Sequence, residues 1–307
     1  MNYSNSTNVP KSSLKLFKIT VIILLLFFGI VCNGLALWVF CCKMKKWKVT
    51  VIYMVNLIIS DILILMTFPF QLYDYFSTSK LENNLCKASI SFYVMNTYMS
   101  IFTITIISAD RYLAIRFPVR SKRWRSPGKA VGICCIVWLF QISLSIMLTL
   151  RLDYIIPVCF QKVSNTPNPM FLLFAVVGFT VPLIIISFCT VQVIRTLYSK
   201  EKRDVNEQRS VRKSINIILS NMVVFVICFL PIHMGYTIRF VAETVKVTDQ
   251  TLEQIKRFID VAISMAHSNC VLDSLCYYFV AGEFWKASDL SPRIIYSNIK
   301  KKSLVTD

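Results

Sequence analysis

The chain has 307 residues and a formal net charge of +18, yet only 16% of its residues are charged while 55% are hydrophobic. A soluble domain has about 25% charged residues and needs that polar surface to cover its core. The composition therefore excludes a disordered chain, a nucleic-acid-binding protein and an ordinary soluble enzyme, and it indicates a membrane protein.

Seven stretches of the chain are predicted to cross a bilayer as helices. A crossing takes about 20 apolar residues, and each stretch has at most one charged side chain. Pro167 and Pro169 place the start of the fifth stretch near residue 170. The spans are 19–42, 49–73, 88–109, 130–150, 170–194, 214–238 and 261–282. We therefore predict an all-α membrane protein, folded as a seven-transmembrane helix bundle.

The distribution of basic residues predicts the orientation of the bundle. Cytoplasmic segments of membrane proteins carry an excess of Lys and Arg. With the C-terminus inside, the cytoplasmic segments hold 23 of the 34 Lys and Arg residues. The N-terminus is therefore expected outside.

Features of the outer segments agree with this orientation. Asn2 and Asn5 each begin a glycosylation tripeptide in the predicted outer tail. Of the eleven cysteines, only Cys86 and Cys159 fall at or beyond the outer ends of the spans. Two cysteines in an oxidising compartment allow one pairing, so we expect a disulfide between them.

Two carboxylates lie inside predicted spans, where an ionisable side chain is costly and indicates a functional site. Asp61 is in the second span and Asp273 in the seventh, with Ser100 and Asn269 at similar depth. Their oxygen atoms are suited to a small hard cation such as sodium, or to a shared proton. The alternative is that these groups only hydrogen-bond the helices together. Apart from this structural sodium ion, no cofactor is expected.

The spans also carry, in order, residues that resemble those of one receptor family. The third span ends in Asp110-Arg111-Tyr112, 25 residues after Cys86. The other matching residues are Asn33-Gly34, Asn56, Asp61, Trp138, Pro182, Phe225 to Pro231, Asn269, Asp273 and Tyr277. In this pattern the chain resembles a rhodopsin-like (class A) G-protein-coupled receptor. Residues 225–233 and 276–279 are most similar to the branch of nucleotide, lysophospholipid and small-carboxylate receptors, including those for kynurenate and lysophosphatidylinositol.

The resemblance implies a division of the chain and a set of roles. It implies an extracellular tail over 1–16, a receptor domain over 17–282, and an amphipathic helix with a cytoplasmic tail over 283–307. Arg111 would be released from Asp110 during activation. Coupling to the G protein is expected at Asp110, Arg111, Tyr112 and Val119. The conformational switch is expected at Phe225, Phe229, Pro231 and Tyr277.

The chain also departs from the family pattern in places that bear on the switch. Val211 stands where many relatives carry an acid facing the arginine of the third span, so no ionic lock between the third and sixth spans is expected. Asp273-Ser274 stands where the family usually has a proline, which removes a helix-kinking residue.

A ligand site is predicted near the outer ends of the spans. Arg151, Arg239 and Arg257 supply cations there, and arginine makes bidentate contacts to carboxylate or phosphate. The expected ligand-binding residues are Tyr93, Thr97, Tyr98, Arg151, His233, Tyr236, Arg239 and Arg257. Alternatively, the bases pair with Asp74, Asp153, Glu243 or Asp260, and His233 is a packing residue.

These features predict a plasma-membrane receptor, not an enzyme, for a small amphiphilic anion such as a lysophospholipid or an aromatic carboxylate. Its partners would be a heterotrimeric G protein, arrestin and a receptor kinase, with no nucleic acid. The alternative from another class is a seven-span transporter or pump, although the chain shows no similarity between its halves.

Overall fold

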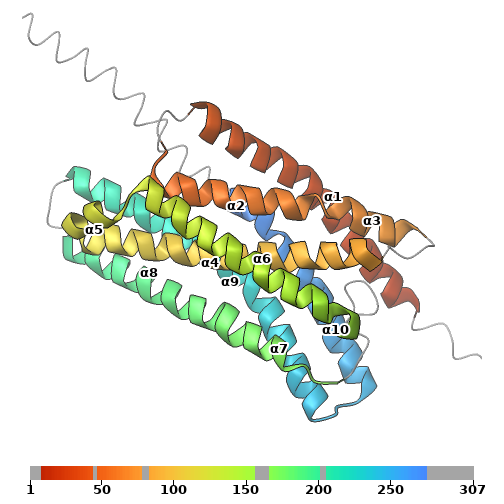
Figure 1. Cartoon of the computed structure of the whole chain (residues 1–307). Helices are drawn as coiled ribbons and strands as arrows, with labels where there is room; N and C mark the ends of the chain where they lie inside the picture. The colour runs from red at the N-terminus through yellow and green to blue at the C-terminus, as the bar shows by residue number, and fades with distance from the viewer. Residues whose placement is uncertain (1–7, 44–46, 78–82, 156–165, 201–204, 275–307) are drawn as a thin grey trace, which may run out of the picture.

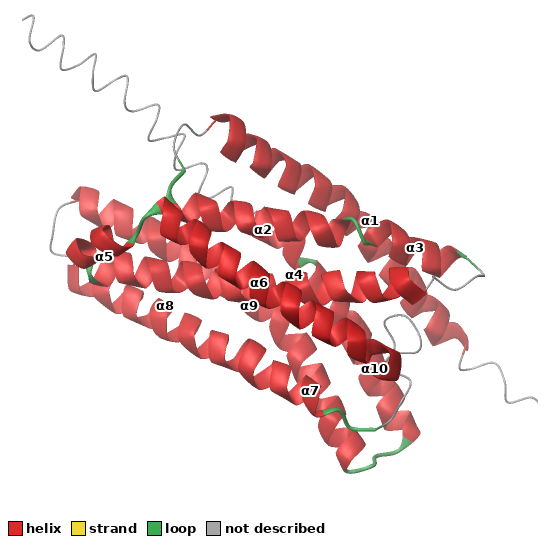
Figure 2. Cartoon of the chain, in the orientation of Figure 1, coloured by secondary structure: helices red, strands yellow, loops and turns green. Residues whose placement is uncertain are grey.

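The computed structural model describes residues 8–43, 47–77, 83–155, 166–200 and 205–274. Within these ranges every regular element is a helix (Figure 2), which confirms the all-α class. Six described stretches are long and apolar enough to cross a membrane. They are Ser13–Cys42, Val49–Phe76, Asn84–Arg116, Pro127–Leu148, Pro169–Thr196 and Ile218–Thr244. The seventh predicted span, 261–282, begins inside a helix and continues beyond the described residues.

The first two spans contain irregular turns. Helix α1 (Asn8–Trp38) continues into the π-helical turn η1 (Val39–Lys43), so the predicted tail 1–16 is partly helical. The second span is two helices, α2 (Val49–Leu65) and α3 (Phe68–Phe76). Pro69 lies in the first turn of α3, where its missing N–H costs nothing. The predicted continuous span 49–73 is therefore broken at residues 66–67.

The remaining helices complete the bundle (Figure 1). They are α4 (Asn83–Arg116), α5 (Pro118–Trp124), α6 (Pro127–Ile155), α7 (Pro169–Leu173), η2 (Phe174–Thr180), α8 (Val181–Lys200), α9 (Val205–Thr244) and α10 (Asp249–His267). The π-helical turn η2 lies just before Pro182, whose missing N–H cannot hold the regular hydrogen-bond ladder. Both η2 and α7 belong to the predicted fifth span.

The pattern of burial fits a bundle surrounded by lipid. Large apolar side chains such as Leu24 on α1, Ile136 on α6 and Ile184 on α8 are exposed. Polar side chains are buried in the interior, where they join helices. For example, Asn56 of α2 donates a hydrogen bond to the hydroxyl of Thr103 in α4. This arrangement is expected where hydrocarbon replaces water around the protein.

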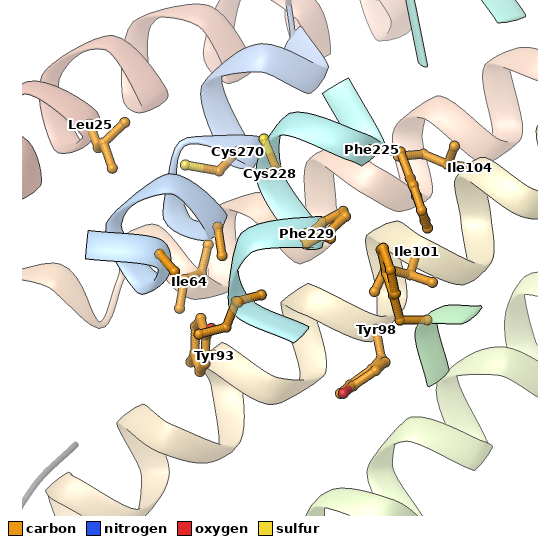
Figure 3. Close-up of a cluster of buried hydrophobic side chains, with 14 of the residues drawn as sticks. Leu25, Ile64, Tyr93, Tyr98, Ile101, Ile104, Phe225, Cys228, Phe229 and Cys270 are labelled. Atoms are coloured by element: carbon orange, nitrogen blue, oxygen red, sulfur yellow. The ribbon is translucent and has the colours of Figure 1, made fainter. Parts of the chain in front are cut away.

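The main core lies between α4, α9 and their neighbours (Figure 3). Phe225 and Phe229 of α9 are fully buried. The ring centroid of Phe225 is 5.3 Å from that of Phe179 and 5.7 Å from that of Phe229. Ile101 and Ile104 of α4 belong to the same cluster. Tyr93, Tyr98, Ile232 and Ile259 of this cluster also line a cavity.

Candidate functional site

A cavity of about 150 Å³ lies between α4, α6, α9, α10 and the segment 168–174. Its walls are mainly apolar and aromatic, with a few polar groups. Among the residues that line it are Tyr93, Thr97, Tyr98, Leu148, Asn168, Phe171, Phe174, His233, Tyr236, Arg239 and Ile259. Six of the eight predicted ligand-binding residues are therefore brought together here. A mostly apolar pocket with a few convergent polar groups is typical of small-molecule sites.

The other two predicted arginines do not contribute described cavity contacts. Arg257 of α10 does not line the cavity; its Nε lies 3.9 Å from Glu253 Oε1 on the same helix. The side chain of Arg151 lies outside what the structure describes. Asp260, one of the acids considered as a partner for the arginines, pairs with Lys18 of α1 at 2.8 Å.

A hydrogen bond joins α4 to α9 on the wall of the cavity. The hydroxyl of Tyr98 is 3.2 Å from His233 Nε2, while His233 Nδ1 is 2.7 Å from the carbonyl oxygen of Phe229. Because a carbonyl only accepts, Nδ1 carries the proton, and Nε2 of the neutral ring accepts from Tyr98. The ring of His233 also stacks on Phe179, with centroids 4.5 Å apart. His233 thus lines the cavity and is also packed, so the two interpretations from the sequence are compatible.

Gly178 in η2 allows Tyr98 to take this position. A Cβ atom at residue 178 would be 2.5 Å from Cε1 of Tyr98, closer than any real side chain allows. On the other side, Tyr98 stacks on Phe174 with a centroid separation of 5.2 Å. The missing side chain of one residue therefore sets the shape of the cavity wall.

Arg239 lines the cavity, but it is not an exposed rim residue. Its Nε donates to Glu243 Oε1 at 2.8 Å, and the two side chains are 7% and 0% exposed. The pairing with Glu243, raised as an alternative from the sequence, is therefore present. An anion in the cavity would share the guanidinium with this carboxylate.

A layer of polar side chains surrounds Asp61 and Asp273, the two carboxylates within the predicted spans. Asp61 Oδ1 and Ser60 Oγ each accept from Asn96 Nδ2 at 3.1 Å. Asn269 Nδ2 donates to Asp273 Oδ2 at 2.9 Å. Both carboxylates are almost completely buried, and they interact electrostatically. Two interacting negative charges in an apolar interior require a cation, a proton or further donors.

Several oxygen atoms in this layer have no hydrogen-bond partner among the described residues. They are Asp61 Oδ2, Ser100 Oγ, Asn269 Oδ1 and Asn33 Oδ1. Buried polar atoms are almost always paired with protein, water or an ion. Oxygen-only ligands suit a hard cation. The donor set therefore fits the predicted sodium ion.

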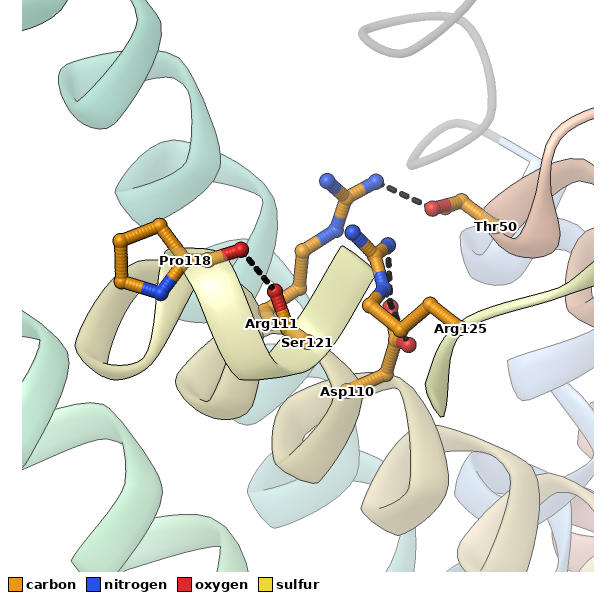
Figure 4. A network of polar contacts seen from close by, with 6 residues as sticks. All are labelled: Thr50, Asp110, Arg111, Pro118, Ser121 and Arg125. Carbon is orange, nitrogen blue, oxygen red and sulfur yellow. Dashed lines mark hydrogen bonds and ion pairs between the residues drawn. The ribbon is translucent and has the colours of Figure 1, made fainter. Parts of the chain in front are cut away.

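At the C-terminal end of α4, Asp110 and Arg111 pair with residues of other segments (Figure 4). Asp110 does not pair with Arg111. Its two carboxylate oxygens accept from Nε and Nη2 of Arg125, both at 2.7 Å. Arg111 instead donates to the hydroxyl of Thr50 in α2. In this conformation Arg111 is already apart from Asp110, so its release during activation stays a prediction.

Arg111 uses only part of its hydrogen-bonding capacity, and α5 lies at the surface of the bundle. The Nε atom of Arg111 is buried without a hydrogen-bond partner among the described residues. Val119 on α5 is 83% exposed. Tyr112 packs against Phe117 and Phe188, with centroids 6.2 and 5.8 Å apart. The predicted coupling residues thus gather at one end of the bundle.

Several predicted positions lie outside the described residues. They are Asn2, Asn5, Cys159 and Tyr277. Cys86 is disulfide-bonded, but its pairing with Cys159 stays a prediction. The side chain of Val211 is likewise not described.

Some residues of the site were not recognised from the sequence. Asn96, Thr50 and Arg125 are polar partners of predicted site residues, yet each comes from a different helix or loop. Gly178 was missed as well. Asn96 lies one helical turn before Ser100 and in the same span, so its helical spacing could have revealed it; nothing in the local sequence identifies Arg125 as the partner of Asp110.

Comparison with known proteins completes the description of the site. The family model for the 7 transmembrane receptor (rhodopsin family) matches residues 32–277. The chain belongs to this receptor family. It is therefore a multi-pass membrane protein and not an enzyme, and the transporter alternative is set aside. Its partners are a G protein and a small ligand.

Similar curated receptors place it within the family. The receptor is 38% identical over 267 residues to G-protein coupled receptor 35 of Homo sapiens, covering 87% of this chain and 84% of that one. It is 33% identical over 272 residues to G-protein coupled receptor 55 of Mus musculus, covering 83% of each chain. It is 30% identical over 284 residues to Lysophosphatidic acid receptor 4 of Homo sapiens, covering 89% and 76%. These relatives confirm the predicted branch.

Proposed function

We propose that this receptor binds a small extracellular amphiphilic anion, either a lysophospholipid or an aromatic carboxylate, and activates a heterotrimeric G protein. The observation that carries the proposal is Arg239, a buried guanidinium on the wall of an otherwise aromatic and apolar cavity. The guanidinium binds carboxylate or phosphate, while the aromatic walls take the apolar part of the ligand. A relative named for lysophosphatidic acid is itself a receptor for an anionic lipid.

The activation step follows from how the cavity is joined to α9. A ligand shifts a conformational equilibrium only by binding one state better than the other. Arg239 and His233 both lie on α9, in the part of the helix that follows Pro231 and lines the cavity. An anion that draws Arg239 inward and disturbs the Tyr98–His233 bond would favour an outward swing of the cytoplasmic half of α9. That swing would open the groove beside Arg111 to the G protein.

The sodium ion would stabilise the resting conformation. Asp61, Ser100, Asn269 and Asp273 would hold it, and Asn33 would supply a further oxygen. The unpaired oxygen atoms of Asp61, Ser100, Asn269 and Asn33 support the assignment. Shared protonation of the two carboxylates, or hydrogen bonding alone, is the competing explanation.

The proposal also covers the location of the receptor and its other partners. The receptor would lie in the plasma membrane with its N-terminus outside, glycosylated at Asn2 and Asn5. Arrestin and a receptor kinase would act on its cytoplasmic side. The excess of basic residues on that side supports this orientation.

A matched ligand panel tests the proposal. Membranes that contain the receptor and a G protein would be exposed to lysophosphatidates and lysophosphatidylinositols, with monoacylglycerols of the same acyl chain as neutral controls. Aromatic carboxylates would be compared with their primary amides. We expect nucleotide exchange to be stimulated by anions and not by their neutral counterparts. Equal responses to the two members of each pair would contradict an anionic ligand.

A further inference from the structure

The inner end of the first span presents two neighbouring thiols at the surface of the bundle. Cys41 and Cys42 lie in η1, and both are free and exposed. The preceding Phe40 is fully buried, in a cluster formed mainly with α2. One side of η1 is therefore held against the bundle, while the two thiols face away from it.

The thiols continue the lipid-facing surface of α1. Leu35 and Trp38 are 59% and 51% exposed, and they lie about two turns and one turn, respectively, before Cys41 and Cys42. Exposed apolar side chains on a spanning helix face the acyl chains of the lipids. An acyl chain attached to either sulfur would run along this surface without displacing any packed side chain.

The residues that follow place the thiols at the edge of the membrane. Lys43 ends η1, and Lys45, Lys46 and Lys48 follow it in the sequence. Such basic clusters bind the anionic headgroups of the cytoplasmic leaflet. The indole Nε1 of Trp47 donates to the carbonyl oxygen of Phe40 at 3.2 Å, and tryptophan favours the membrane–water interface. The side chain of Trp47 is thus held against η1, which favours a position of η1 close to the headgroups.

We propose that Cys41 and Cys42 are sites of S-acylation by a long-chain acyl-coenzyme A, catalysed by a membrane-bound acyltransferase. The cysteine sulfur attacks the carbonyl carbon of the acyl thioester, and the bond from that carbon to the coenzyme A sulfur breaks. The thiol proton ends on the released coenzyme A thiol, so no oxidant or reductant is needed. Cysteines next to the membrane, as here, are the usual acceptors of this modification. The inference rests on the orientation proposed above, but not on the ligand.

A second pair of adjacent cysteines provides a matched comparison. Cys134 and Cys135 lie in α6, and Cys135 is also exposed. They are five and six residues beyond Lys129, which places them roughly 8 Å further along the helix than that cation at 1.5 Å per residue. Cys41 and Cys42 are only one or two residues from Lys43. An enzyme working at the membrane surface would reach the first pair and not the second.

Acyl exchange with a mass tag tests the proposal in cells that express the full chain. Free thiols are blocked, thioesters are cleaved with hydroxylamine, and the released thiols receive a polyethylene glycol tag. We expect up to two tags on the unaltered receptor, one on each single variant, Cys41→Ser or Cys42→Ser, and none on the double variant. The Cys134→Ser/Cys135→Ser variant should keep every tag.

Two further measurements distinguish a lack of acylation from misfolded variants and from the opposite orientation. Peptide mass mapping of the unaltered receptor should find the acyl groups on the fragment 19–43, at Cys41 and Cys42 and not at Cys32, whether or not the variants fold. An N-terminal epitope that is accessible on intact cells reports the orientation independently. An accessible epitope without hydroxylamine-sensitive tags, or tags that persist in the double variant, would overturn the proposal while leaving the receptor function intact.

Discussion

Arg239 and Glu243 form a buried ion pair one helical turn apart on α9, with 2.8 Å between Nε and Oε1. Removing one member of a buried ion pair typically costs about 3–5 kcal/mol. Because Arg239 is buried in this pair, a single substitution of Arg239 cannot separate ligand binding from stability.

A charge-balanced variant separates the two effects. We expect Arg239→Gln to reduce surface expression, and Arg239→Gln/Glu243→Gln to restore it because no buried charge remains. If Arg239 binds the anion, potency should stay low in the double variant. A charge-assisted hydrogen bond contributes about 1.5–3 kcal/mol, which corresponds to roughly ten- to hundredfold in potency. Concentration–response curves with parallel expression measurements decide this, and normal potency in the double variant would show that the pair is only structural.

The Tyr98–His233 hydrogen bond should hold the resting arrangement of α4 and α9. Tyr98→Phe removes the hydroxyl and keeps the ring, at a cost of about 0.5–1.5 kcal/mol. We expect basal nucleotide exchange to rise roughly two- to tenfold. Tyr236→Phe makes the same change on another wall of the cavity and should leave basal exchange unchanged. An unaltered basal rate in Tyr98→Phe would mean that this bond does not distinguish the two states.

Gly178 should be required for the cavity wall. Gly178→Ala places a Cβ atom 2.5 Å from Tyr98 Cε1, and such overpacking costs about 1–3 kcal/mol. We expect a lower midpoint of thermal unfolding in detergent and a weaker agonist response. Gly132→Ala is the control, because a Cβ atom there meets nothing within 4 Å. Equal unfolding midpoints for the two variants would contradict this role of Gly178.

Arg125 should position the coupling surface by holding Asp110. Arg125→Gln removes two charge-assisted hydrogen bonds and frees Asp110 to pair with the neighbouring Arg111. We expect a lower maximal G-protein activation with unchanged ligand affinity. Arg120→Gln removes an exposed cation from α5, which ends just before Arg125, and should have little effect. A normal maximal response in Arg125→Gln would show that Arg111 couples without this arrangement.

The polar layer predicts an effect of sodium on agonist binding. If the ion stabilises the resting state, raising sodium at constant ionic strength should lower agonist affinity, because linkage is reciprocal. Asp61→Asn should abolish this dependence. Choline chloride serves as the control for salt screening. An affinity that does not depend on sodium in the unaltered receptor would leave protonation or hydrogen bonding as the role of this layer.

Much of the architecture was predictable because the bilayer restricts the sequence strongly. A span needs about 20 apolar residues, so residues 19–42 and 130–150 were visible as helices from composition alone. The rarity of charge within spans singled out Asp61 and Asp273. The family was recognised because its characteristic residues, among them Asp110-Arg111-Tyr112, occur in order along the successive spans.

What the sequence by itself determined is therefore which segments enter the membrane and which side chains carry chemistry. Only the tertiary structure decided how those side chains pair. Asp110 accepts hydrogen bonds from Arg125 and not from its neighbour Arg111. Arg111 donates to Thr50, which is 61 positions away in the sequence. Such partners are set by how helices cross and by which rotamers the packing leaves open. Neither the helix crossings nor the rotamers can be predicted from hydropathy and local spacing.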